Sequence, residues 1–195
     1  DMNLSIQKLS TLRIEYSHDM VLGVGACYYY GENKIVIYRA NSLSQCDGRK
    51  LLHELFHFFS NASSSFGLAI DEGMTELLSS EESFTSEISY YEQCDYVRML
   101  AEIIGSEPLK AFYLSGNIEH IVKALTKIIP DEDMAYYFIS SLDDALAYED
   151  DYSFGWQNPD FDTTNLSKEE LIKAIETNKN FIGYTLDNYF YAAKG

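Results

Sequence analysis

The sequence predicts an α+β fold, with a small N-terminal antiparallel or mixed sheet followed by a helical C-terminal half. Aromatic and β-branched runs alternate with turn residues over the first forty positions, whereas apolar residues recur at helical spacing from about residue 47 onward. Because the strands cluster at the front and do not alternate with helices, an α/β fold is not expected. The 195 residues suffice for one domain with a sizeable core and are too few for two.

Composition and charge exclude several classes of protein. Hydrophobic residues make up 46% of the chain and charged residues 23%, which is neither a disordered nor a fibrous composition. The net charge of -17 repels phosphate backbones and anionic lipids, so we expect no nucleic-acid partner. No apolar run approaches the roughly 18 residues needed to span a bilayer, so we expect no membrane insertion. Three cysteines are too few for a disulfide framework. The chain begins at Asp1 without a starter Met, so we expect a trimmed piece of a longer chain.

Three strands are expected before residue 40. The first covers 12–16, and the other two cover 25–30 and 34–38. The short Gly/Asn segment between the last two is typical of a β-hairpin.

The helix expected from Asp47 or Arg49 to Ser60 is apolar almost all round. A helix of this kind belongs at the centre of a domain, so the polar residues inside it need an explanation. A shorter helix is expected from Asp71 to about Ser80. Further helices are predicted at 88–104, 108–114 and 118–129, after Asp131, and at 171–175 behind a Ser167/Glu170 capping box. The acidic loop 149–162, within a stretch from 128 to 167 that has no Lys or Arg, is interpreted as a solvated face in preference to a calcium loop.

The segment 53–57 reads His-Glu-Leu-Phe-His. Residues four apart share a helix face, so His53 and His57 can face one ion. A catalytic zinc uses three protein ligands and one water, and Glu54, about 100° round the helix from His53, is placed to take a proton from that water. The alternative is a buried polar network, but such a network costs several kcal/mol in desolvation unless something compensates it, as a metal does.

The third ligand is expected from the segment 71–76, Asp-Glu-Gly-Met-Thr-Glu. Glu72 and Glu76 are again four apart, so one can bind zinc while the other accepts a proton from a ligating imidazole. Gly73 either allows a close approach of backbone or substrate or is an ordinary helix-weakening glycine. Six residues after His57 stands Ser63, which excludes the zinc peptidases whose third ligand is a histidine there.

These two motifs resemble those of the gluzincins, the zinc peptidases that include thermolysin and the zinc aminopeptidases. The resemblance covers about residues 25 to 80. It implies a single zincin-like domain over 1–195, with the sheet and active-site helices at about 1–80 and a helical part at 81–195. It also implies one Zn²⁺ per chain, with these roles: His53, His57 and Glu72 as ligands, Glu54 as catalytic base, and Glu76 as the residue that orients a ligand. Glu76 stands at the spacing typical of the zinc aminopeptidases, so the choice between Glu72 and Glu76 stays open.

The resemblance further implies a peptide or protein substrate, extended along a sheet edge formed by Ile35, Val36 and Ile37. A Tyr or His donor for the oxyanion is expected from the downstream helices. The candidates are Tyr91 and His120, with Tyr90, Tyr113 and Tyr137 beside them. The predicted function is hydrolysis of peptide bonds through a metal-activated water. The alternative is a zinc-binding regulatory or adhesion domain with little or no hydrolytic activity.

Overall fold

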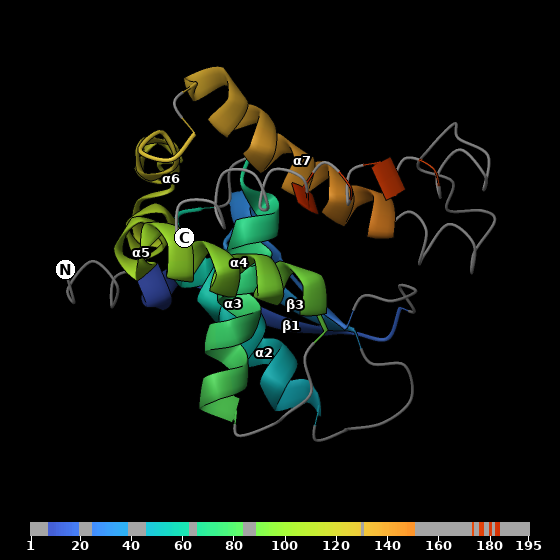
Figure 1. Ribbon diagram of the computed structural model, residues 1–195. Coiled ribbons are helices and arrows are strands. Elements are labelled where there is room, and N and C mark those ends of the chain that lie inside the picture. The colour runs from blue at the N-terminus through green and yellow to red at the C-terminus, as the bar shows by residue number, and fades with distance from the viewer. Residues whose placement is uncertain are drawn as a thin grey trace.

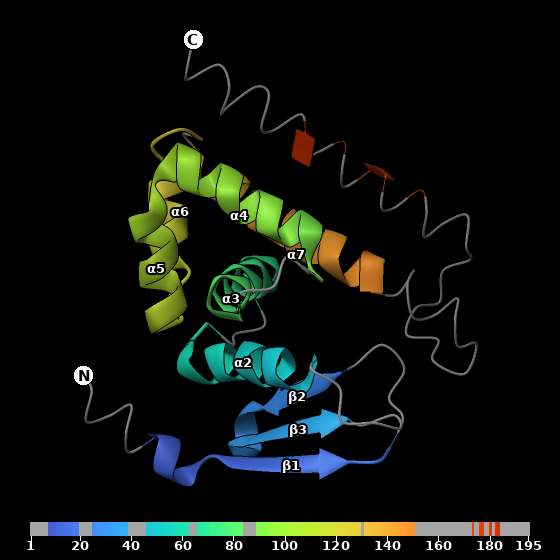
Figure 2. The same ribbon diagram turned by 90° about the horizontal axis from the view of Figure 1, so that it is seen from below.

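The computed structural model describes residues 8–19, 25–38, 46–62, 66–83, 89–129 and 131–150, together with 173, 176, 177, 180, 182 and 183. Within them the chain has a three-stranded sheet at the front and is otherwise mostly helical, which confirms the predicted α+β class. Figures 1 and 2 show the arrangement in space: α2 lies on the sheet, α3 lies on α2, and the later helices form the layer beyond α3.

The sheet is mixed, with strand order β1-β3-β2. Strand β1 (Arg13–Ser17) is parallel to β3 (Lys34–Tyr38), and β2 (Ala26–Tyr29) is antiparallel to it. The turn between β2 and β3 is the short helix η1 (Tyr30–Glu32), followed by Asn33 at φ 49°. Asparagine tolerates this left-handed conformation better than most residues do. The predicted hairpin is therefore confirmed.

The expectation that 34–38 forms a substrate-binding edge is wrong, because β3 is the central strand and is paired on both sides. The side chains of Ile35, Val36 and Ile37 are buried. An apolar run identifies a strand from its own residues, but its place in the sheet depends on partners elsewhere in the chain. Among the described strands, β1 and β2 are the edges.

Helix α2 (Cys46–Phe59) packs between the sheet and α3 (Leu68–Ser83), as Figure 2 shows. It is not buried all round: Phe58 is fully buried, whereas Phe59 is 37% exposed.

Helix α3 begins three residues before the expected Asp71. The cause is tertiary, since the Asp143 carboxylate accepts hydrogen bonds from the backbone N–H groups of Gly67 and Ala69. This side chain caps α3 from another helix, so the local sequence does not reveal where α3 begins.

Up to residue 150 of the described chain, four helices form the layer beyond α3: α4 (Tyr91–Ile104), α5 (Ser106–Ser115), α6 (Glu119–Leu125) and α7 (Glu132–Asp150). As expected, α4 ends at Gly105, which has φ 84°. Asp131 caps α7, since its Oδ1 accepts hydrogen bonds from the N–H groups of Asp133 (2.9 Å) and Met134 (3.3 Å). Helix α6 is shorter than the expected 118–129. The Ser167/Glu170 capping box and residues 151–162 of the acidic loop lie outside the described residues.

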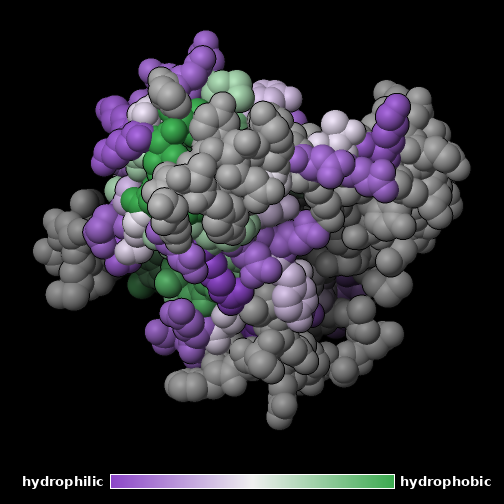
Figure 3. Space-filling view, in the orientation of Figure 1, coloured by the Kyte–Doolittle hydropathy of each residue, from purple (hydrophilic) through white to green (hydrophobic). Residues whose placement is uncertain are grey.

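The main core lies among α3 and the helices after it. Its largest fully buried side chains include Ile70, Leu100, Phe112, Ile121 and Phe138. On the face drawn in Figure 3, hydrophilic residues cover most of the coloured surface, in keeping with the net charge of -17. None of the described helices combines the length and apolarity needed to cross a bilayer.

Gly73 lies where α3 crosses α4. A Cβ at this position would come within 2.7 Å of the carbonyl carbon of Gln93 and within 2.8 Å of Val97 Cγ2. The first of these atoms is backbone and cannot rotate away. We therefore expect Gly73→Ala to lower the free energy of unfolding by roughly 1–3 kcal/mol, despite the better helix propensity of alanine.

Chemical denaturation of Gly73→Ala beside Gly48→Ala tests this expectation. Gly48 lies in α2, and a Cβ there would meet nothing within 4 Å. The control variant should be unchanged or more stable by up to about 1 kcal/mol. Equal stability of the two variants would contradict the close helix crossing.

Candidate metal centre

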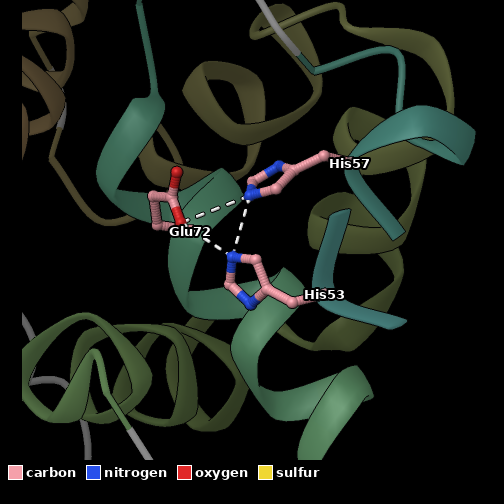
Figure 4. A group of neighbouring side chains, drawn as sticks. All are labelled: His53, His57 and Glu72. Carbon is pink, nitrogen blue, oxygen red and sulfur yellow. Dashed lines mark hydrogen bonds and ion pairs between the residues drawn. The ribbon is translucent and has the colours of Figure 1, made fainter. Parts of the chain in front are cut away.

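Three donor atoms from two helices meet at one point. His53 Nε2 lies 3.1 Å from His57 Nε2, and Glu72 Oε2 lies 3.4 Å and 3.3 Å from these two nitrogens (Figure 4). Ligands at 2.0–2.1 Å from a tetrahedral ion are about 3.3 Å apart. The triangle therefore has the size of three corners of such a tetrahedron, and these residues lie close enough to bind a metal ion.

Local structure explains why these three side chains meet. His53 and His57 are one turn apart on α2, so their rings project from the same face toward α3. Glu72 lies in the second turn of α3, which packs against that face of α2. All three side chains are largely buried, with 12%, 13% and 23% of their surfaces exposed.

A carboxylate stands behind each imidazole. Glu76 Oε2 lies 3.0 Å from His53 Nδ1, and Asp71 Oδ2 lies 3.1 Å from His57 Nδ1. Such partners hold a proton on Nδ1, so that each neutral ring presents the lone pair of Nε2 to the triangle. Two lone pairs and a carboxylate oxygen repel one another unless a cation or protons lie between them. Glu72 Oε2 is buried and receives no hydrogen bond from the described residues, which fits a site for a cation.

The two supporting carboxylates are held in turn. Glu76 Oε1 pairs with the Arg49 guanidinium and accepts a hydrogen bond from the Ser89 N–H at 2.7 Å. Asp71 Oδ1 accepts a hydrogen bond from the Ser60 hydroxyl at 2.9 Å. The sequence nominated Glu76 for the place behind an imidazole but missed Asp71, whose only local signal is that it adjoins Glu72. Arg49 was also missed, although it lies one turn before His53.

Without a metal, the centre is a set of ion pairs. Burial lowers the pKa of His53, but the carboxylates of Glu72 and Glu76 outweigh burial and raise this pKa to about 9. For His57, Asp71 and Glu72 likewise outweigh burial and raise the pKa to about 10. Burial would raise the pKa of Glu72, but both imidazoles lower it to about 2. Without a metal the carboxylates therefore favour protonated imidazoles, and a bound divalent cation would take the place of this positive charge.

We therefore expect metal affinity to rise with pH. Metal binding needs the lone pair of each Nε2, so it displaces the protons that the carboxylates favour on His53 and His57, and the apparent affinity rises with pH by up to about 100-fold per pH unit. Because the pKa values of His53 and His57 are raised in the folded state, their protonation also stabilises the metal-free fold below pH 6.5. This contribution is lost as the pH rises through 9 to 10. Calorimetric titration in two buffers of different ionisation enthalpy counts the protons. Binding without proton release would contradict the ion-pair description.

Glu54 lies on α2 next to His53 and is 8% exposed. Its Oε2 accepts a hydrogen bond from the backbone N–H of Tyr28 in β2, at 2.7 Å. Burial raises the pKa of Glu54, while the charges of the two imidazoles act in the opposite direction. A carboxylate with a raised pKa is a better proton acceptor near neutral pH than an exposed one.

Of the aromatic residues expected for oxyanion binding, Tyr90 and Tyr113 lie near the centre, whereas Tyr91 and His120 do not. Among the described contacts, none joins Tyr91 or His120 to the donor triangle. Tyr91 is 63% exposed, and His120 is exposed on α6, which packs against α4, α5 and α7. Two other tyrosines lie closer. The Tyr90 ring stacks on His53 with centroids 5.8 Å apart, and the Tyr113 hydroxyl is 2.9 Å from Thr75 Oγ1, which lies 3.4 Å from His57 Nδ1. Their helical spacing alone does not distinguish them from Tyr91.

Asp71→Asn and Glu76→Gln are each expected to weaken metal binding by about 10- to 100-fold, because an amide no longer favours the required tautomer of the imidazole as strongly. Competition with a chromophoric chelator measures this change. Asp95→Asn is the control, since Asp95 is exposed and pairs only with Arg98 among the described ion pairs. Unchanged affinity in both test variants would contradict the supporting role.

Comparisons with protein-family models, with curated proteins and with solved structures found no match. The proposed function therefore depends on the two sequence motifs and on the chemistry of the site.

Proposed function

We propose that this chain is a zinc-dependent peptidase of the gluzincin type, with a zincin-like fold. The observation that supports this proposal most strongly is the triangle of two imidazole nitrogens and one carboxylate oxygen with edges of 3.1–3.4 Å. Three protein ligands leave the fourth tetrahedral position for water, as catalytic zinc sites require. A sheet followed by a helix that carries both histidines agrees with the fold that the motifs imply.

The donor set favours zinc over other divalent ions. Two imidazoles with one carboxylate suit zinc, whereas calcium and magnesium prefer sites made entirely of oxygen ligands. The carboxylates behind both imidazoles are typical partners of zinc-bound histidine. Glu72, not Glu76, is the proposed third ligand, because Glu72 Oε2 faces both Nε2 atoms while Glu76 faces Nδ1 of His53.

Zinc in this position would lower the pKa of a bound water and polarise a substrate carbonyl. Glu54 would accept the proton of the attacking water and pass it to the leaving amine. Its place beside His53 and its raised pKa suit this role. The Tyr28 N–H holds one of its oxygens and so fixes the orientation of the carboxylate.

The substrate would be an extended peptide that lies along β2. This strand takes the role that the sequence analysis assigned to β3. Strand β2 is an edge among the described strands, and the hydrogen bond from its Tyr28 N–H to Glu54 places this edge beside the proposed catalytic base. A peptide that pairs with this edge would pass Glu54 and the donor triangle. The charge of -17 favours substrates of basic character through long-range attraction.

A second candidate is a zinc-binding regulatory or adhesion domain with little hydrolytic activity. The hydrogen bond from Tyr28 to Glu54 favours it, because this bond occupies one of the two oxygens that a catalytic base presents.

Incubation of the zinc-loaded chain with a mixed peptide library tests the proposal, with the products identified by mass spectrometry. We expect cleavage that a chelator abolishes and added zinc restores. A chain that binds one zinc and cleaves no peptide would support the second candidate instead.

A further inference from the structure

We propose that Asp143, on α7, is a positioning residue for the metal centre. This inference rests on the proposed zinc site, to which Asp143 adds a support from the far side of α3. The helices after α3 contribute none of the proposed ligands. They can therefore affect the position of the ligands only through contacts with α2 and α3.

Asp143 fixes the first turn of α3 with both of its carboxylate oxygens. Oδ2 accepts a hydrogen bond from the Gly67 N–H at 2.7 Å, and Oδ1 accepts one from the Ala69 N–H at 2.9 Å. The first turns of a helix leave backbone N–H groups without partners inside the helix. The helix continues directly from this turn, because Asp71 N–H donates to Gly67 C=O at 3.0 Å. Two residues that form the centre, Asp71 and Glu72, follow immediately.

The same turn is closely packed in the core. Ala69 and Ile70 are almost fully buried. Gly67 has φ 83°, and a Cβ there would come within 2.9 Å of the side chains of Phe112 and Ile118. The turn therefore has little room to find other partners, and water cannot easily replace the Asp143 carboxylate at the Ala69 amide.

Helix α2 is tied to the same helical layer at its C-terminal end. The Asn61 N–H donates to the Tyr113 C=O of α5 at 3.0 Å, and the Ser60 hydroxyl lies 3.2 Å from the same oxygen. The layer of α5 and α7 therefore holds both α2 and α3 in place, and these are the two helices that carry the proposed ligands. A site of this kind tolerates errors of only about 0.5 Å in ligand position. Loss of the Asp143 support should therefore shift the Glu72 carboxylate enough to weaken metal binding.

The test compares two capping residues on different helices. Asp143→Ala removes the cap of α3, and Asp131→Ala removes the matching cap of α7, whose Oδ1 also receives two backbone N–H groups. Both variants are expected to lose thermal stability. Zinc affinity, measured by chelator competition well below both melting temperatures, should fall about 10-fold or more in Asp143→Ala and stay within about 2-fold in Asp131→Ala.

Asp143→Asn keeps one acceptor oxygen and should lose less affinity than Asp143→Ala. It also keeps the test usable if Asp143→Ala does not fold. The visible spectrum of the cobalt(II)-loaded protein gives a second readout, because its bands depend on ligand geometry. We expect a changed spectrum in the Asp143 variants and an unchanged one in Asp131→Ala.

Equal zinc affinity and equal cobalt spectra in the Asp143 and Asp131 variants would overturn the inference while leaving the zinc site intact. A wild-type chain that binds neither zinc nor cobalt would instead overturn the proposed function. The two failures are therefore distinguishable in one experiment.

Discussion

Glu54→Gln is expected to reduce peptide hydrolysis by about 100- to 10,000-fold, which is the usual contribution of a positioned proton acceptor. Glutamine matches glutamate in size, and its amide oxygen can still accept the hydrogen bond from the Tyr28 N–H, so the fold should be kept. It cannot accept the proton of the attacking water. The rate is measured on a peptide identified in the library screen, and zinc content is measured on the same sample.

Zinc content is expected to stay at about one per chain in Glu54→Gln, because Glu54 is not a proposed ligand. Glu107→Gln is a suitable control, since Glu107 is exposed at the start of α5 and its one described ion pair is with Lys110. If Glu54→Gln kept its hydrolytic rate, the role of Glu54 as proton acceptor would be wrong.

Glu72→Ala is expected to weaken zinc binding by more than about 100-fold, beyond the 10- to 100-fold loss typical of a residue that only supports a ligand. It removes one of three ligands and leaves two imidazoles to hold the ion. Competition with a chromophoric chelator measures the dissociation constants of the wild type and the variant.

Glu76→Ala is the matched comparison, because Glu76 lies one turn further along α3 and faces the Nδ1 atom of His53. It should lose less affinity than Glu72→Ala. The reverse order would make Glu76 the third ligand and would contradict the assignment from the donor triangle.

The parts of the site that the sequence predicted are those with local geometry. The i, i+4 spacing places His53 and His57 on one face of a helix wherever that helix lies in the fold. The same spacing places Glu72 and Glu76 on one face of the next helix. The hairpin between β2 and β3 was also predictable, since its turn and both strands are contiguous in sequence.

What the sequence did not predict depends on contacts between distant segments. The central place of β3 is set by its pairing with β1, which lies before the hairpin. Asp143 moves the start of α3 from a position 76 residues away in the chain. Tyr90 reaches His53 while its neighbour Tyr91 is exposed, and this choice depends on how α4 packs against α3.

Zinc K-edge X-ray absorption of the zinc-loaded wild-type chain tests the central claim most directly. We predict one zinc per chain with about four nitrogen or oxygen ligands at about 2.0–2.1 Å, two of them imidazoles, and no sulfur ligand. Failure to bind zinc at any pH would contradict this account. A sulfur ligand at about 2.3 Å would also contradict it, because a cysteine would then occupy a position that the proposed mechanism assigns to Glu72 or to water.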